Sequence, residues 1–247
     1  MEIWDLYDEN RRLTGEIMVR GEAMPPGRYH LVVEALFLND RGETLLQRRA
    51  KDKEPMPDLW SVTGGSALAG EDSAAACLRE TREEMGFTPD MAKGRVLLSE
   101  RRDRAEHSFF RDVWLFRQNV DIADMRFQPE EVQDARWILP EEIFADPALW
   151  ADLSELYFWR QAYPYLLLES MRIRIPQGIY RHYKGNRYQV IDLGLHSETQ
   201  EPMVVYRALY GPGEVWVRPA RMWNEIVTLS GGQTARRFAL EEEGPCP

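Results

Sequence analysis

Residues 65–87 have the sequence GSALAGEDSAAACLRETREEMGF, and this stretch decides the fold. Glu80, Glu83 and Glu84 share one face of a helix, because positions i, i+3 and i+4 are neighbours on its surface. Three carboxylates on one face repel one another unless a cation neutralises them. Oxygen ligands of this kind suit Mg²⁺ or Mn²⁺, and Mg²⁺ commonly binds a phosphate substrate as well. The stretch therefore predicts a helix that binds a divalent metal.

The residues around this helix predict where it begins and ends. The glycine pair at 64–65 breaks the chain, and Asp72 supplies N-cap chemistry before a run of alanines. Gly86 follows the last periodic residues, where a left-handed cap is expected. Arg79 lies one helical turn before Glu83, so an ion pair between them would aim that carboxylate.

The stretch resembles the Nudix box, G-x5-E-x7-R-E-U-x-E-E-x-G-U, in which U is a bulky apolar residue. The matching positions are Gly65, Glu71, Arg79, Glu80, Glu83, Glu84, Gly86 and Phe87. Thr81 departs from the pattern, because the family usually has an aliphatic residue there. That position packs the helix and holds no metal, so the departure affects packing more than chemistry. A solvated helix with scattered charges is the competing interpretation, but it predicts no fixed register of glycine, acids and arginine.

The resemblance implies roles for the matched residues. Glu80 and Glu84 are the expected direct metal ligands, and Glu83 would bind directly or through water. The backbone carbonyl of Gly65, or that of Gly64, would complete the metal shell. The residues expected to support these ligands are Glu71, Arg79 and Gly86.

Other residues are expected to take part in catalysis. The resemblance implies a general base among the box glutamates Glu80 and Glu83 or in a later loop, where Glu131 and its neighbour Glu130 are candidates. A solvated loop pair is the alternative there. The family often places the strand end that corresponds to Arg48 and Arg49 against the diphosphate, and arginine suits bidentate phosphate contacts. A solvated strand end is equally open.

The order of predicted elements over residues 1–147 resembles the whole Nudix domain, an α/β/α sandwich with a mixed sheet. Apolar runs predict strands at 29–38 and 44–49, joined as a hairpin, and two short strands within 3–20. Further strands are expected at 59–63, 96–98 and 111–117 and before Trp137, and Pro140 opens a helix. The predicted fold class is α+β.

The opening residues 4–8 and 29–32 resemble the Nudix branch closest to isopentenyl-diphosphate isomerase. That enzyme uses a cysteine shortly after a tryptophan. Here the corresponding stretch is Trp60-Ser61-Val62-Thr63, which has no cysteine, and Cys77 lies inside the box helix. Hydrolysis is therefore expected rather than isomerisation. His30, in an apolar strand, is expected to be a hydrogen-bonded core or wall residue rather than a metal ligand.

The sequence pattern after residue 147 differs from that of the preceding part. Residues 148–172 predict a helical connector that contains Pro164 and packs its apolar face on the first domain, with a partner interface as the alternative. Residues 173–240 alternate short strands and turns, which predicts a small all-β, SH3-like domain. They resemble a domain family of unknown function, DUF1653, through motifs such as GIYRHYKG at 178–185. Residues 241–247 are expected to be a disordered tail.

Composition limits the classes of function. The chain has 247 residues and a net charge of −10, which argues against general nucleic-acid or acidic-membrane binding. Residues 1–169 carry 21 Lys and Arg against 33 Asp and Glu, whereas residues 170–247 carry 10 against 8, which supports a boundary near 170. Basic residues alternate with aromatic ones in the second part, and we favour a sheet core over a single-stranded nucleic-acid surface.

The cysteines and the apolar runs indicate the compartment. Two cysteines, Cys77 and Cys246, do not make a disulfide framework. No apolar run has the length of a membrane span, and we expect no signal peptide. A cytoplasmic location is therefore expected.

The sequence thus predicts a Mg²⁺- or Mn²⁺-dependent hydrolase that cleaves a diphosphate linkage in a nucleoside diphosphate derivative or another organic diphosphate. A non-catalytic Nudix sensor, whose small domain contacts RNA or protein, is one alternative, and an isoprenoid diphosphate isomerase is a second, disfavoured one. The expected partner is a small-molecule diphosphate, without membrane or nucleic acid. Whether the chain forms a homodimer is left open.

Overall fold

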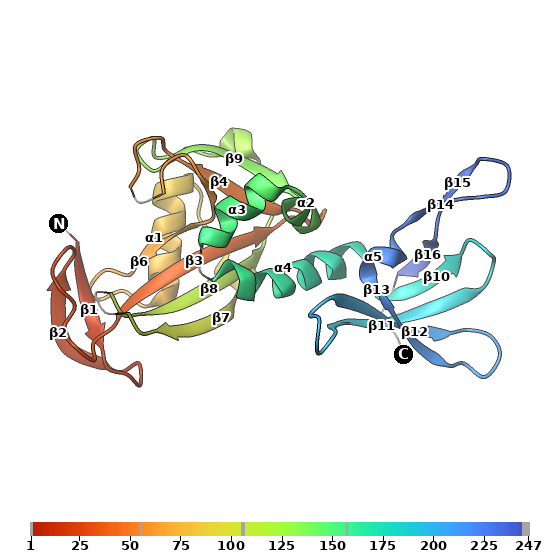
Figure 1. Ribbon diagram of the computed structural model, residues 1–247, viewed down its shortest axis with the longest axis horizontal. Coiled ribbons are helices and arrows are strands. Elements are labelled where there is room, and N and C mark those ends of the chain that lie inside the picture. The colour runs from red at the N-terminus through yellow and green to blue at the C-terminus, as the bar shows by residue number, and fades with distance from the viewer. Residues whose placement is uncertain (1, 55, 105–106, 157, 244–247) are drawn as a thin grey trace. The chain divides into compact units, whose positions relative to one another are not determined.

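A computed structural model describes residues 2–54, 56–104, 107–156 and 158–243. The chain divides into two compact units, Met1–Ala162 and Tyr163–Pro247 (Figure 1). Among the described residues, no helix is both long and apolar enough to span a bilayer.

The first unit is built on a seven-stranded mixed sheet with the order β5-β4-β3-β8-β7, to which β6 and β9 are added through β3 and β4. Its strands are β3 (His30–Leu38), β4 (Thr44–Arg49), β5 (Trp60–Ser61), β6 (Thr63–Ser66), β7 (Gly94–Arg102), β8 (Phe109–Arg117) and β9 (Val132–Ile138). Strands β3 and β8 are parallel, and the other pairs are antiparallel. The prediction of a mixed sheet is confirmed.

The predicted hairpin of residues 29–49 is wrong beyond its turn. Strands β3 and β4 pair only at Leu38 and Thr44. From Val32 to Ala35, the same edge of β3 is occupied by β6 instead, while β4 pairs with β9 along its length. The two halves of the sheet therefore separate beside β6, and this separation makes room for acidic side chains.

Helix α1 (Ser73–Met85) begins and ends as the sequence predicts. The Asp72 side chain accepts a hydrogen bond from the Ala75 N–H, and Gly86 adopts a left-handed φ of 76°. The helix contacts β3 and β6 (Figure 1). Thr81, the departure from the box, is fully buried and donates to the Cys77 carbonyl at 2.9 Å. Its hydroxyl is thus satisfied within the helix, which explains how a polar residue is tolerated there.

The remaining elements of the first unit frame the sheet. They are β1 (Ile3–Tyr7), β2 (Leu13–Val19), the 3₁₀ helices η1 (Met91–Lys93) and η2 (Ile122–Asp124), α2 (Pro140–Ala145) and α3 (Pro147–Glu155). Helix α4 (Trp159–Arg174) contains Pro164 and continues into the second unit. The predicted apolar stripe is buried at Leu149 and Leu153, and α3 also binds β5 because Asp152 accepts from the Trp60 N–H.

The second unit contains a five-stranded antiparallel sheet with the order β13-β12-β11-β10-β16. Its elements are β10 (Gly178–His182), β11 (Arg187–Leu195), β12 (Pro202–Ala208), β13 (Val215–Pro219), α5 (Ala220–Trp223), β14 (Ile226–Thr228), β15 (Thr234–Arg236) and β16 (Phe238–Glu243). Trp223 stacks on Phe238 with ring centroids 3.8 Å apart, and Tyr180 and Tyr206 are buried beside them. These aromatic residues build a core, as we favoured from the sequence.

The prediction of a disordered tail is wrong for residues 241–243. They belong to β16, which pairs with β10. Arg187 contributes to holding the strand, because its Nε donates to Glu241 Oε2 at 2.8 Å. Sequence inspection missed this cross-strand pairing of opposite charges. Residues 244–247, including Cys246, lie outside the described residues.

Candidate active site

The end of α1 and strand β6 border a cavity of about 260 Å³. Its lining comes from the N-terminal hairpin, the loop after β4, β6, α1 and the loop before β9. The carboxylates that line it are Glu2, Glu54, Glu80, Glu83, Glu84 and Glu131. The cationic residues that line it are Arg20, Arg49, Lys53 and Arg79. The described lining therefore carries more negative than positive side chains.

Glu84 is the most deeply placed of these carboxylates, with 7% of its surface exposed. Its Oε2 accepts hydrogen bonds from Thr63 Oγ1 at 2.5 Å and from Gln47 Nε2 at 3.1 Å. The Gly64 N–H donates to the same oxygen at 3.3 Å. Burial raises the pKa of Glu84, although these donors oppose the shift. Its orientation is therefore fixed from β4 and β6, where the sheet separates.

Glu80 lies against Gly65. A Cβ atom at residue 65 would come within 2.4 Å of Glu80 Oε1, so only glycine leaves room for the carboxylate as it stands. Burial raises the pKa of Glu80 to about 7, and the negative charge of Glu84 adds to the effect while Arg79 opposes it. Glu80, the predicted metal ligand, and Gly65, the predicted glycine of the box, are therefore neighbours in the lining of the cavity.

One guanidinium group organises the acidic residues of the box. Arg79 donates to Glu71 at 2.8 Å, to Glu80 at 2.9 Å and to Glu83 at 3.1 Å. The predicted ion pair between Arg79 and Glu83 is confirmed. Glu71 also accepts from the Leu68 N–H, so the supporting arrangement reaches the start of the box. Glu83 keeps 48% of its side chain exposed and lies at the rim, unlike Glu80 with 15%.

Sequence inspection missed Glu34. This residue lies on β3 opposite Gly64, and a Cβ atom at residue 64 would be 2.5 Å from Glu34 Oε2. Burial raises the pKa of Glu34 to about 7; Arg111, 3.6 Å away, opposes the shift, and the charges of Glu84 and Glu80 add to it. A signal was present, because Glu34 is the one charged residue in the run HLVVEALFL.

The structure separates the members of two predicted pairs. Glu131 lines the cavity and forms an ion pair with Lys53, whereas Glu130 lies outside it in an open pocket. Arg49 lines the cavity, whereas Arg48 binds Asp58 at 3.1 Å. Adjacent residues of a strand point to opposite faces, so only one of the two arginines can reach the site.

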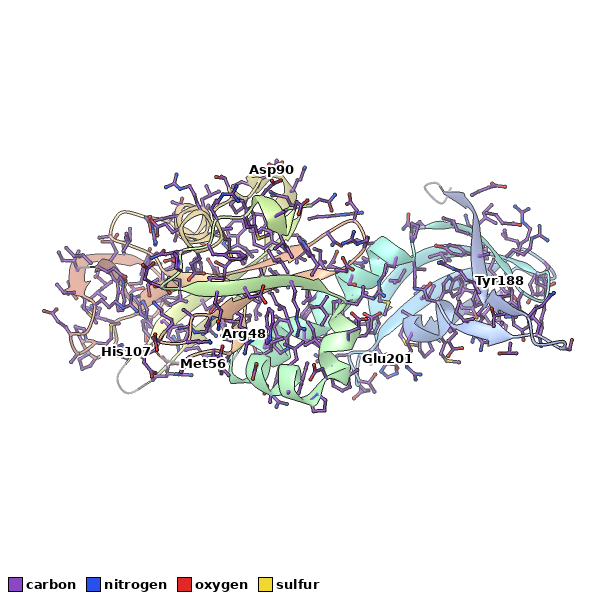
Figure 2. The ribbon with its side chains drawn as sticks, turned by 90° about the horizontal axis from the view of Figure 1, so that it is seen from above. Arg48, Met56, Asp90, His107, Tyr188 and Glu201 are labelled. Atoms are coloured by element: carbon purple, nitrogen blue, oxygen red, sulfur yellow. The ribbon has the colours of Figure 1, made fainter. Side chains whose placement is uncertain are left out.

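Three further titratable residues lie outside the cavity lining. His30 is buried and stacks on Trp4 at 4.3 Å, and burial lowers its pKa to about 4. The expectation that His30 lies in the core is therefore met. Its Nδ1, however, has no hydrogen-bond partner among the described residues. Burial raises the pKa of the Cys77 thiol to about 12, which makes it a poor nucleophile. His107 is exposed in a loop (Figure 2).

The donor set fits a hard divalent cation. Glu80 and Glu84 are buried carboxylates with raised pKa values, which is the arrangement that a bound cation would relieve. The glycine pair provides the close approach that such a shell requires. In the part of the chain that the structure describes, no group of three or more Asp, Glu, His or Cys side chains is arranged to hold a metal ion. Arg79 and Thr63 hold the two carboxylates instead.

A comparison with known families decides the classification. The family model described as NUDIX domain matches residues 28–160, which contain the cavity's helix and sheet. The chain belongs to the Nudix family. It is accordingly an enzyme of the Nudix hydrolase type. A second family model, described as a protein of unknown function (DUF1653), matches residues 178–240, so both predicted resemblances are confirmed.

Individual Nudix relatives agree with this assignment. The chain is 42% identical to an uncharacterised Nudix hydrolase of Listeria monocytogenes over 146 residues, which span 59% of this chain and 84% of the relative. It is 30% identical to an isopentenyl-diphosphate Delta-isomerase of Streptomyces coelicolor, over 56% of this chain and 72% of the relative. The crystal structure of a Deinococcus radiodurans protein superposes with a TM-score of 0.51 and 26% identity, covering 66% of this chain and 99% of that chain.

Proposed function

We propose that the chain hydrolyses a diphosphate linkage in an organic diphosphate, a class that includes nucleoside diphosphate derivatives, with Mg²⁺ or Mn²⁺ bound at the box glutamates. The observation that carries the proposal is the convergence of Glu80 and Glu84 on the Gly64–Gly65 strand beside a cavity with basic side chains. A bound divalent cation would neutralise charge on the phosphate oxygens and lower the pKa of a bound water.

The box residues have distinct tasks in this proposal. Glu80 and Glu84 are the direct ligands, and Glu83 serves from the rim. The backbone carbonyl of Gly65 is a further ligand. Arg79 orients the glutamates, because it binds Glu80 and Glu83 together. Three donors fix Glu84 before any ligand arrives, so little side-chain entropy is lost on binding.

In this proposal, proton transfer and phosphate binding are carried out by cavity residues that lie outside α1. We assign the general base to Glu131, whose carboxylate would accept a proton from the attacking water. Lys53 holds that carboxylate in place, since the two form an ion pair. Arg49, which lines the same cavity, supplies a guanidinium for phosphate oxygens. Arg48 is left out of this set, because it is bound to Asp58.

Product formation tests the proposal, because a linkage between two organic groups yields two phosphomonoesters and a terminal diphosphate yields one phosphomonoester and inorganic phosphate. A panel of organic diphosphates is incubated with the full chain in Mg²⁺, and with EDTA in a parallel series. Metal-dependent formation of phosphomonoesters, with or without inorganic phosphate, supports hydrolysis and names the class of substrate. A folded protein that forms neither phosphomonoesters nor inorganic phosphate from any member of the panel in Mg²⁺ would contradict it.

Two alternatives predict different outcomes. A non-catalytic sensor would bind a diphosphate without turnover, and its small unit would carry the response. An isomerase would convert an isoprenoid diphosphate without releasing phosphate. Similarity to the Streptomyces isomerase favours the isomerase alternative. However, β5, where a catalytic cysteine would be expected after Trp60, has Ser61 instead, and Cys77 is buried in α1.

We keep two proposals for the second unit. Its five-stranded antiparallel sheet is compatible with an SH3-like arrangement. A role in contacting RNA or protein has its best support in exposed aromatic residues such as Tyr210 and Trp216. The domain limits proposed from the sequence are 1–147, 148–172 and 173–240.

A further inference from the structure

Among the described residues, no apolar side chain lines the cavity at the glutamate cluster. Every described residue of its lining is charged, a serine, a glutamine or a glycine. Sites for hydrocarbon chains or planar rings are lined predominantly by hydrophobic and aromatic side chains. An apolar group in this cavity would cover charged side chains and gain no apolar contact. The lining therefore selects against such a group.

Cationic side chains approach the cavity from segments other than α1. Arg20 follows β2, Arg49 ends β4, and Lys53 lies in the next loop. Arg79 is held by three acidic residues of the box, whereas Arg20 and Lys53 each form an ion pair with one carboxylate. The first three residues therefore lie where they would meet anionic oxygens beyond those held at the box glutamates.

The pairing of Arg20 permits an exchange of partners. Its guanidinium binds Glu2 at 2.7 Å, and the two side chains are 54% and 41% exposed. An ion pair this exposed contributes little free energy, so a phosphate group can replace Glu2 at small cost. The displaced Glu2 and Glu54, which also lines the cavity, then remain as acceptors for hydroxyl groups of a ligand.

The size of the cavity limits what enters it. A volume of about 260 Å³ is small for a ligand site and leaves room for a diphosphate with one compact group. A separate cavity contains Val120, Ile122 and Trp137, but it shares no described lining residue with the first. An apolar part of a substrate therefore has no described wall next to the glutamates.

We infer that the substrate is a small hydrophilic diphosphate whose second moiety carries hydroxyl groups and a further phosphate, which Arg20, Arg49 and Lys53 bind. This inference rests on the proposed hydrolysis at the same cavity. It excludes a prenyl chain as the second moiety.

Two compounds with equal numbers of carbon atoms test the inference. They are 5-phosphoribosyl 1-diphosphate and isopentenyl diphosphate, each given to the full chain in Mg²⁺. We expect kcat/KM to be at least about tenfold higher for the phosphoribosyl compound, because charge-assisted contacts to its extra phosphate have no counterpart in the other. Equal or greater kcat/KM for isopentenyl diphosphate would overturn the inference.

The Arg20→Gln variant tests whether the preference for the phosphoribosyl compound arises from the cavity. It should raise KM for the phosphoribosyl compound by about tenfold and change KM for isopentenyl diphosphate by less than about twofold. Arg28→Gln is the matched control, because Arg28 pairs with Glu16 and does not line the cavity. An equal effect of Arg20→Gln on both compounds would contradict the inference.

A failure of hydrolysis can be told apart from a failure of the inference. If neither compound is hydrolysed, calorimetric titration of both into the same chain with Mg²⁺ measures the preference directly. Tighter binding of the phosphoribosyl compound would then support the inference while the proposed hydrolysis fails. Equal or tighter binding of isopentenyl diphosphate would overturn the inference.

Discussion

The carboxylate of Glu80 occupies the space that a Cβ atom of residue 65 would need, with Oε1 only 2.4 Å from that position. The glycine that opens the box and the first of its clustered glutamates are therefore in direct contact, although fourteen residues separate them in sequence. This contact connects the shape of β6 to the chemistry of α1, and it leads to a specific mutational prediction.

Gly65→Ala should damage function far more than stability. The three atoms nearest to the new methyl group all belong to the end of the Glu80 side chain, which can move, so we expect the free energy of unfolding to fall by less than about 1 kcal/mol. The displaced carboxylate should weaken Mg²⁺ binding by about tenfold or more. Calorimetric Mg²⁺ titration and urea unfolding measure the two effects. Unchanged Mg²⁺ affinity would argue against Glu80 as a ligand.

Gly64→Ala should show the opposite balance. A Cβ atom at this position lies 2.4 Å from the Val33 carbonyl oxygen, which is backbone and cannot turn aside. We expect a loss of about 2 kcal/mol or more in the free energy of unfolding, because β6 must shift against β3. Urea unfolding without metal measures this loss directly. A variant as stable as Gly65→Ala would show that the strand pairing is looser than described.

Lys53 and Glu131 should behave as a coupled pair in catalysis. Glu131→Gln should lower kcat by about 10²-fold or more, since it removes the proposed base. Lys53→Gln should lower kcat/KM, because it releases Glu131 and removes a cation from the cavity. A double-mutant cycle on kcat/KM should give an interaction energy of about 1 kcal/mol or more. Strict additivity would mean that the ion pair has no role in the reaction.

His30 should make the protein less stable in acid. Burial lowers its pKa to about 4 in the folded chain, below its ordinary value of 6.5. The neutral ring therefore supports folding fully above about pH 6.5, and this contribution falls as the pH drops towards about 4. The loss amounts to about 3 kcal/mol at most. Comparing unfolding free energies of the native chain and His30→Phe across this range isolates the effect, and parallel curves would contradict it.

Much of the site could be predicted because it is local in sequence. The spacing of Glu80, Glu83 and Glu84, the cap at Gly86 and the pair formed by Arg79 and Glu83 all follow from helical geometry. The structure adds that Glu83 stays at the rim while the other two are buried. That difference depends on where β6 lies, which no helical pattern specifies.

Long-range pairing explains what the sequence did not show. Insertion of β6 beside β3 limits the expected hairpin to its turn, and the same insertion brings Glu34 to Gly64. The sequence around an isolated acidic residue in an apolar strand does not indicate which residue lies opposite it, since that residue belongs to another strand. Residues 241–243 were mistaken for a tail for the same reason, because pairing with β10 gives them their structure.

Metal-dependent hydrolysis of an organic diphosphate by the Glu84→Gln variant, followed as phosphomonoester formation, tests the central claim most directly. The variant keeps the shape of the buried side chain but removes its charge, and Asp124→Asn, an exposed carboxylate outside the cavity lining, serves as the control. We predict that Glu84→Gln lowers the Mg²⁺-dependent rate by about 10²-fold or more while circular dichroism shows a folded chain, and that the control retains its rate. A folded Glu84→Gln variant with an unchanged rate would contradict the assignment of this cavity as the active site.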